Sequence, residues 1–209
     1  MLTPWQTYNS LLAEKVIKEL KNRNIQGFYF STREEAVSKV LEIIPKNSVV
    51  SWGGSATLHE TGLIDALKKG DYAIIDPRSG KNAAEMDKLA RQALNCDYFL
   101  MSANAIAASG ELVNMDGIGN RVAAQAYGPR HVIVVAGINK VEQNLDAAVL
   151  RAKTVAAPLC VLPYSKDGFS TFEELLDKAR DAASHLVITS RSAFKERITV
   201  ILVGETLGF

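Results

Sequence analysis

The sequence predicts an α/β fold in which helices flank a mostly parallel β-sheet. Helical and extended patterns alternate along nearly the whole chain, as in successive strand–helix–strand units. The 209 residues are 47% hydrophobic and 22% charged, which suits one compact domain with a substantial core. The sequence contains no internal repeat, low-complexity tract or Pro-rich linker. We therefore expect a single domain over residues 1–209.

The first half of the chain follows this alternation. Apolar residues recur at helical spacing over about residues 5–24, and residues 27–30 form a short apolar run typical of a strand. Ser31 or Thr32 can cap a helix over residues 33–44. The further elements predicted here are a strand over 48–52, a helix over about 56–69, a strand over 72–76 and a helix over about 81–95.

The second half begins with a break in the alternation. Residues 97–105 and 106–115 are two adjoining extended segments with no helical pattern between them. Beyond them we predict a helix over about 119–127, a strand over 131–137, a helix over 141–156 that begins near Asn139, strand and loop over 158–170, a helix over 171–183, and strands over 185–190 and 197–204.

Composition argues against several classes of partner. The 24 Lys and Arg residues nearly balance the 23 Asp and Glu residues, so the chain has no basic excess for nucleic acid or an anionic membrane. Cys96 and Cys160, with three scattered histidines, are too few for a metal site, and we expect both thiols to be buried and inert. No apolar run approaches the roughly eighteen residues that span a bilayer. We expect a cytoplasmic protein.

Residues 104–121 carry the strongest functional signal. Three glycines, Gly110, Gly117 and Gly119, stand among polar side chains just before a predicted helix. Glycine permits positive φ and a close approach of backbone to ligand, and a helix N-terminus offers free N–H groups to an anion. We therefore expect all three glycines to contribute to a ligand-binding surface.

Polar side chains of the same segment supply candidate chemistry. Glu111 and Asp116 are candidates for a catalytic base or nucleophile. Alternatively, Glu111 lies in water at a bulge and Asp116 belongs to an ordinary Asp-Gly turn. The neighbouring polar residues that we expect to contact the ligand are Ser109, Asn114, Asn120 and Arg121.

A second glycine-bearing turn follows the predicted strand at 48–52. Gly53 and Gly54 can turn backbone N–H groups toward an anion, and Ser55 and Thr57 add hydroxyl groups. The alternative is a tight turn in which Ser55 or Thr57 only caps the helix.

The helix after this turn and a third strand-to-helix junction add candidates. Glu60 and His59 follow in the first turns of the helix, where Glu60 suits the helix dipole and His59 faces either the ligand or solvent. Lys140 is the cation best placed to reach an anion from the carboxyl edge of the sheet. Asn139 beside it is a ligand contact or only a helix cap.

Four separated blocks of the chain resemble the lactate-utilisation (LUD) domain family, LutC/YkgG-like. They are SWGGSATLHETGLIDAL, SANAIAASGELVNMDGIGNRVAA, HVIVVAGINKVEQNLDAAVLRAKTVAAP and RITVILVGETLGF, in this order. The resemblance runs from about residue 5 to 160 and resumes at about 197. Many relatives carry a cysteine cluster after the third block, and this chain has only Cys160 there. We therefore predict no iron–sulfur cofactor on this chain.

The resemblance implies a fold and a function. The family looks like a branch of the superfold shared by ribose-phosphate isomerases, glucosamine-phosphate deaminases and CoA transferases, whose ligands lie over the carboxyl ends of parallel strands. It favours Glu60, which belongs to the HETG block, as a catalytic candidate. Glu111 resembles in its setting the glutamate that attacks the thioester in CoA transferases. The resemblance also implies a part in lactate utilisation beside separate iron–sulfur protein partners.

Three functional hypotheses follow. The first is binding of a small anionic metabolite, a 2-hydroxy or 2-oxo acid or a phosphorylated sugar, in a cleft at the carboxyl edge, within a lactate-oxidising system. The second is a stand-alone isomerase, hydrolase or CoA/acyl transferase that uses Glu111 or Asp116. The third is a non-catalytic ligand-binding or assembly subunit, a homo-oligomer whose N-terminal helix is a dimer or partner surface.

Overall fold

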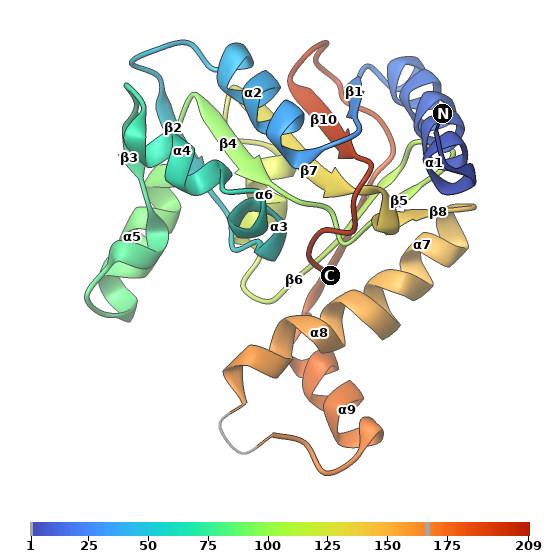
Figure 1. Cartoon of the computed structure of the whole chain (residues 1–209). Coiled ribbons are helices and arrows are strands. Elements are labelled where there is room, and N and C mark those ends of the chain that lie inside the picture. Colours follow the sequence, from blue (N-terminus) through green and yellow to red (C-terminus); the bar gives the residue numbers. More distant parts are fainter. Residues whose placement is uncertain (1, 166–167) are drawn as a thin grey trace.

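Six parallel strands form the central sheet of the computed structural model, which describes residues 2–165 and 168–209, the side chains of residues 181 and 182 excepted (Figure 1). The strand order is β1-β10-β7-β4-β2-β3, and every neighbouring pair is parallel. The strands are β1 (Gln26–Phe30), β2 (Val49–Trp52), β3 (Ala73–Ile75), β4 (Tyr98–Met101), β7 (His131–Gly137) and β10 (Ile198–Val203). The predicted α/β class with a mostly parallel sheet is confirmed.

A second, four-stranded sheet lies across one face of the first. Its order is β8-β5-β6-β9, formed by β5 (Ala105–Ala107), β6 (Leu112–Asp116), β8 (Val141–Glu142) and β9 (His185–Thr189). β6 pairs antiparallel with both β5 and β9. The expected break in the parallel alternation over residues 97–115 is therefore present, as a hairpin that leaves the main sheet.

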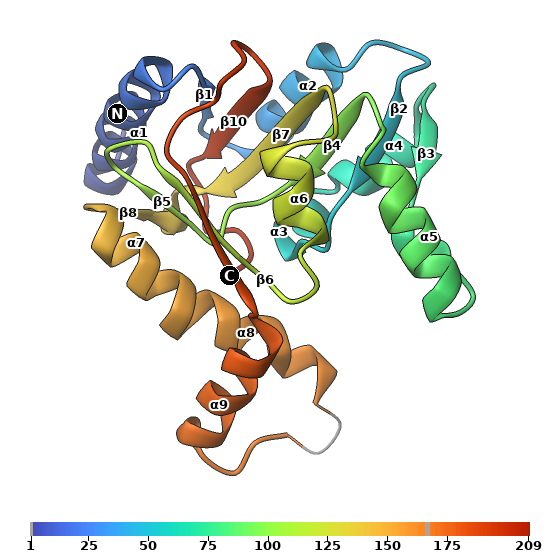
Figure 2. The ribbon, with the colours of Figure 1, turned by 180° about the vertical axis from the view of Figure 1, so that it is seen from behind.

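Helices cover both faces of the central sheet (Figures 1 and 2). The helices are α1 (Pro4–Asn22), α2 (Arg33–Ile43), α3 (Ala56–Glu60), α4 (Leu63–Lys69), α5 (Ala83–Ala93), α6 (Asn120–Ala126), α7 (Leu145–Arg151), α8 (Ala157–Val161) and α9 (Phe172–Ala182). α2, α3 and α4 pack on one face. α1, α5, α6 and the β5–β6 hairpin pack on the other.

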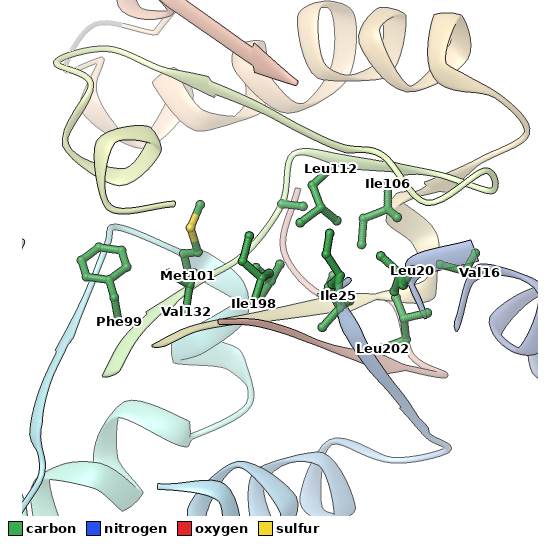
Figure 3. Packing of buried hydrophobic residues seen from close by; sticks show 14 of the residues in the cluster. Val16, Leu20, Ile25, Phe99, Met101, Ile106, Leu112, Val132, Ile198 and Leu202 are labelled. Carbon is green, nitrogen blue, oxygen red and sulfur yellow. The ribbon is translucent and has the colours of Figure 1, made fainter. Parts of the chain in front are cut away.

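The sequence of β7 is apolar, as a strand at the centre of the sheet requires. All its residues after His131 are buried, as expected of a parallel strand covered on both sides. Val132 and Val134 join one apolar cluster, and Ile133 and Val135 join the other. Figure 3 shows the first cluster, in which side chains of the sheet meet those of α1 and of the β5–β6 hairpin.

Two predicted helices differ from the structure. The helix expected over 56–69 is divided into α3 and α4 at Gly62, whose φ of +73° interrupts the helical backbone. The helix expected from Asn139 begins only at Leu145, because Asn144 is the residue whose side chain caps it. Between Asn139 and that cap lie the end of a short 3₁₀ turn, η2 (Ile138–Lys140), and strand β8.

The prediction of strand and loop over 158–170 is wrong for residues 158–164, which are helical. α7 continues through a π-helical segment, η3 (Ala152–Ala156), into α8 and a final 3₁₀ turn, η4 (Leu162–Tyr164). Pro158, which has no N–H to donate, directly follows the π-helical segment, where the regular hydrogen-bond pattern of the helix changes. Residues 166–167 of this prediction lie outside the described residues. No helix among residues 2–165 and 168–209 is long and apolar enough to cross a bilayer.

Candidate functional site

A cavity of about 870 Å³ opens at the carboxyl edge of the central sheet. Four neighbouring strands supply its floor, because the segments that follow β2, β3, β4 and β7 all reach it. The start of α6 and the α8 region form its walls. The volume lies within the range of small-molecule sites, and the place is the one where parallel α/β sheets bind ligands.

Lys140 is the most deeply buried charged group of this cavity, with 3% of the residue exposed. Its Nζ donates to Thr57 Oγ1 at 2.8 Å and to Ser102 Oγ at 3.0 Å. Burial, and after it the nearby positive charge of Arg151, lowers the pKa of Lys140 to about 7. Lys140 forms no ion pair with any carboxylate of the described residues.

The Gly53–Gly54 turn brings two arginines to the cavity. A Cβ atom at Gly53 would lie 2.5 Å from Arg121 Cδ, and one at Gly54 would lie 2.7 Å from Arg78 Nη2. Glycine is therefore needed at both positions for these side chains to lie against the turn. Arg78 Nη2 also donates to Tyr164 Oη at 3.0 Å, which connects the end of β3 to the α8 region.

Asp116 lies at the cavity, but its carboxylate is already engaged. Its Oδ1 accepts from the backbone N–H of Gly119 at 3.3 Å. Its Oδ2 accepts from the backbone N–H groups of Arg121 and Val122 at 3.0 and 3.3 Å, and it pairs with Arg121 Nε at 3.3 Å. Because Gly119 has no side chain to cap α6, Asp116 performs this capping function.

Glu111 lies away from the cavity, at the turn of the β5–β6 hairpin. It forms an ion pair with Arg23 of α1 and accepts a hydrogen bond from Ser109 Oγ at 2.6 Å. Gly110 in the same turn has a φ of +96°, which explains the glycine without a ligand. This part of the glycine-rich segment packs against α1.

Other predicted residues also have partners in the fold. Asn114 Nδ2 donates to Gln125 Oε1 at 2.7 Å, and Asn139 Oδ1 accepts from the N–H of Leu207 at 3.1 Å. Glu60 Oε2 accepts from the N–H of Gly208 at 2.7 Å. These hydrogen bonds join separate segments of the chain, and none of these three predicted residues lines the cavity.

The structure thus brings about half of the predicted site residues together. Those that line the cavity are Gly53, Gly54, Ser55, Asp116, Gly117, Asn120, Arg121 and Lys140. Those that do not are Thr57, Glu60, Ser109, Gly110, Glu111, Asn114, Gly119 and Asn139.

Sequence reasoning missed several lining residues. Arg78 follows the predicted strand at 72–76, so its position was an available signal. Ser102 lies inside the extended segment predicted over 97–105, and only the observed end of β4 at Met101 places it after a strand. Nothing in the sequence marked Tyr164 as a site residue, because its segment was expected to be strand and loop. The prediction of a buried Cys160 is wrong, since this thiol is exposed at the cavity. Cys96 is buried as predicted, and burial raises its pKa to about 12.

One solved structure has a similar fold over nearly the whole chain. No curated protein matches the chain. The crystal structure of a DUF162 family protein from Deinococcus radiodurans superposes with a TM-score of 0.55 over 94% of this chain and 98% of that one, at 13% sequence identity. The structure of eIF2B delta from Chaetomium thermophilum is similar over 54% of this chain and 49% of that one, with a TM-score of 0.35 and 20% identity.

The first of these likenesses extends over nearly the whole chain and supports the fold. The sequence profile of the LUD domain matches residues 13–203, which include both sheets and nearly all of the cavity lining. The chain therefore belongs to the LUD domain family.

Proposed function

We propose that this LUD domain protein binds a small anionic metabolite in the cavity at the carboxyl edge of the sheet. The ligand class is a 2-hydroxy or 2-oxo acid, or a phosphorylated sugar. The main support is that Lys140 and Arg78 both line the cavity and neither pairs with a carboxylate of the described part of the chain. Lys140 is buried, whereas Arg78 is exposed. For Lys140, a buried positive charge without a counterion is unfavourable, and an anionic ligand offsets that cost.

Arg121 adds to this proposal. Its Nε is shared with Asp116, and its Nη2 donates to the carbonyl oxygen of Met115 at 2.5 Å. The guanidinium is thus held in place at the cavity by two fixed partners. A positioned guanidinium offers a planar set of donors that suits carboxylate and phosphate groups.

The family is associated with lactate utilisation, and we extend this association to the present chain as a proposal. Separate iron–sulfur protein partners would carry the electrons, since Cys160 alone cannot hold a cluster. The exposed side chains of Trp5, Tyr8 and Leu11 support the outer face of α1 as a surface for such a partner or a second copy. The two free thiols suit a cytoplasmic location.

A second candidate function is catalysis of isomerisation, hydrolysis or acyl transfer on a larger phosphorylated or thioester substrate. The observation that favours it is the volume of about 870 Å³, which exceeds what a three-carbon acid needs. Turnover by the purified chain alone would select this function.

Ligand-induced thermal stabilisation tests the main proposal. Lactate, pyruvate, glycolate, sugar phosphates and CoA thioesters are added to the wild type, to Lys140→Met and to Lys153→Met, which changes an exposed lysine of η3. A ligand at a hundred times its Kd should stabilise the wild type by roughly 2.7 kcal/mol, a rise in Tm of several degrees. We expect Lys153→Met to keep this rise and Lys140→Met to lose most of it. If no ligand class shifts the wild-type Tm, the proposal fails.

A further inference from the structure

The nitrogen of Lys140 is held by two neighbouring hydroxyl groups. Nζ has two hydrogen-bond acceptors, Thr57 Oγ1 and Ser102 Oγ. Both hydroxyl groups donate their own hydrogens elsewhere, to the carbonyl oxygens of Leu207 at 3.3 Å and of Ala103 at 3.4 Å. Each hydroxyl therefore presents lone pairs, not a hydrogen, to the lysine.

This arrangement suits a neutral amine as well as an ammonium ion. A neutral amine has two N–H groups and one lone pair in tetrahedral directions. The two hydroxyls take both hydrogens of Lys140, which leaves the lone pair free. Lys140 itself lines the cavity, so a ligand bound there lies next to this side chain.

The charges around Lys140 favour the neutral form. Burial is the largest cause that lowers the pKa of Lys140, and the charge of Arg151 of α7 is the next. Cys160 of α8 and Glu60 of α3 oppose them, and Arg121 of α6 lowers the pKa least. Glu60 is itself engaged by the backbone N–H of Gly208. Burial beside like charges is the environment that activates lysine amines as nucleophiles.

We infer that Lys140 forms an imine with the carbonyl carbon of a 2-oxo acid bound in the cavity; this inference rests on the proposed anion site. The nitrogen lone pair attacks the carbonyl carbon, and the carbonyl oxygen takes up one proton that the nitrogen loses. The carbon–oxygen bond then breaks as the C=N bond forms, and the hydroxyl leaves as water with the second nitrogen proton. Amine and oxo acid thus give imine and water, and no oxidant or reductant is required.

Neighbouring groups suit the two ends of such a ligand. Ser102 Oγ, 3.0 Å from Nζ, accepts a hydrogen bond from the nitrogen that loses its protons and so orients the amine. Arg78 and Arg121, which lie against the Gly53–Gly54 turn, are the donors for the carboxylate. A 2-hydroxy acid offers the same carboxylate but has no carbonyl group, so it binds without reacting.

Reductive trapping tests this inference. The protein is incubated with pyruvate, glyoxylate or 2-oxobutyrate and cyanoborohydride, and the intact mass and the modified peptide are determined. We expect one adduct per chain, with the mass of the oxo acid less one oxygen atom, on the peptide that contains Lys140. Lys140→Arg, which keeps the charge but cannot form an imine, should lose the adduct, and Lys153→Met should retain it. Lactate should give no adduct and should slow trapping of the oxo acid.

Thermal stabilisation by the same 2-oxo acids without reductant separates the two proposals. Stabilisation without an adduct on Lys140 overturns the imine and leaves the anion site standing. Adducts spread equally over exposed lysines also overturn it. If no 2-oxo acid stabilises or labels the protein while another anion does, the imine fails alone. If no anion of any class stabilises it, both proposals fail.

Discussion

The ammonium group of Lys140 makes folding depend on pH, whatever ligand the cavity binds. Its pKa is about 7 in the folded protein and near 10.5 in an unfolded chain. Between these values the unfolded chain binds more protons, so this lysine makes the free energy of unfolding rise with pH. The slope approaches about 1.4 kcal/mol per pH unit. Below about pH 7 both states are protonated, and the lysine adds no slope.

Comparison with Lys140→Met isolates this contribution. We expect the wild type to gain stability relative to the variant as pH rises from about 7 to about 10, and the difference to stay constant at lower pH. Urea unfolding across this range measures it, and other titrating groups cancel in the difference. Lys153→Met should run parallel to the wild type. Parallel curves for Lys140→Met would show that Lys140 titrates normally.

Single residues also show what the sequence could and could not reveal about the site. Lys140 and the Gly53–Gly54 turn were found because the ends of parallel strands meet at one edge. The role of Glu111 was not visible, since its partner Arg23 is 88 residues away in the chain. Asp116 was correctly placed at the cavity, but only the folded backbone reveals the three N–H groups that its carboxylate accepts.

Among the elements, the α3–α4 pair depends on one backbone conformation. Gly62 has a φ of +73°, and a Cβ atom there would meet no atom within 4 Å. Gly62→Ala therefore adds backbone strain without a clash, at a cost of about 1 kcal/mol. We expect a Tm lower by roughly 2–4 °C in a calorimetric scan. Gly62→Asn should lose less, because asparagine tolerates this conformation.

An exposed position of the same helix supplies the control for this prediction. Lys69→Ala in α4 changes a solvent-facing side chain and should leave Tm nearly unchanged. Equal losses for Gly62→Ala and Gly62→Asn would mean that the side chain, not the backbone angle, causes the effect.

The accuracy of the predicted elements follows from the same local rules. Strand β7 was predicted to the residue, because a fully apolar run between a turn and a glycine has few alternatives. α8 was missed, since a proline and an apolar pentapeptide resemble a strand or loop when read alone. It is helical because α7 leads directly into it through the π-helical segment.

Across the whole molecule, arginine side chains join segments that lie far apart in the sequence. Arg197 donates to the carbonyl oxygens of Ala124, Gln125 and Pro129, and so ties the C-terminal end of α6 to the start of β10. Arg23 donates to the carbonyl oxygens of Ser109 and Ser190. These guanidinium groups satisfy carbonyl oxygens of the last turn of α6 and of loops, which have no hydrogen-bond partner within a helix or sheet.

Arg151 both holds segments of the fold together and affects the pKa of Lys140 in the cavity. It donates to the carbonyl oxygen of Asn104 after β4, at 2.6 Å, and to that of Asn139 after β7, at 3.2 Å. It thereby holds α7 against the carboxyl edge of the central sheet, and its charge also lowers the pKa of Lys140. Arg151→Met should therefore cost about 3 kcal/mol of unfolding free energy and raise the pKa of Lys140.

Two measurements separate these effects of Arg151→Met. Urea unfolding gives the stability, and NMR of lysine labelled with ¹³C at Cε gives the titration of Lys140. Arg180→Met, which removes an exposed guanidinium of α9, should change neither. A loss of stability with an unchanged Lys140 titration would show that Arg151 stabilises the fold but does not affect the pKa of Lys140. A raised pKa would show that the residue which holds α7 against the carboxyl edge of the central sheet also lowers the pKa of the lysine amine.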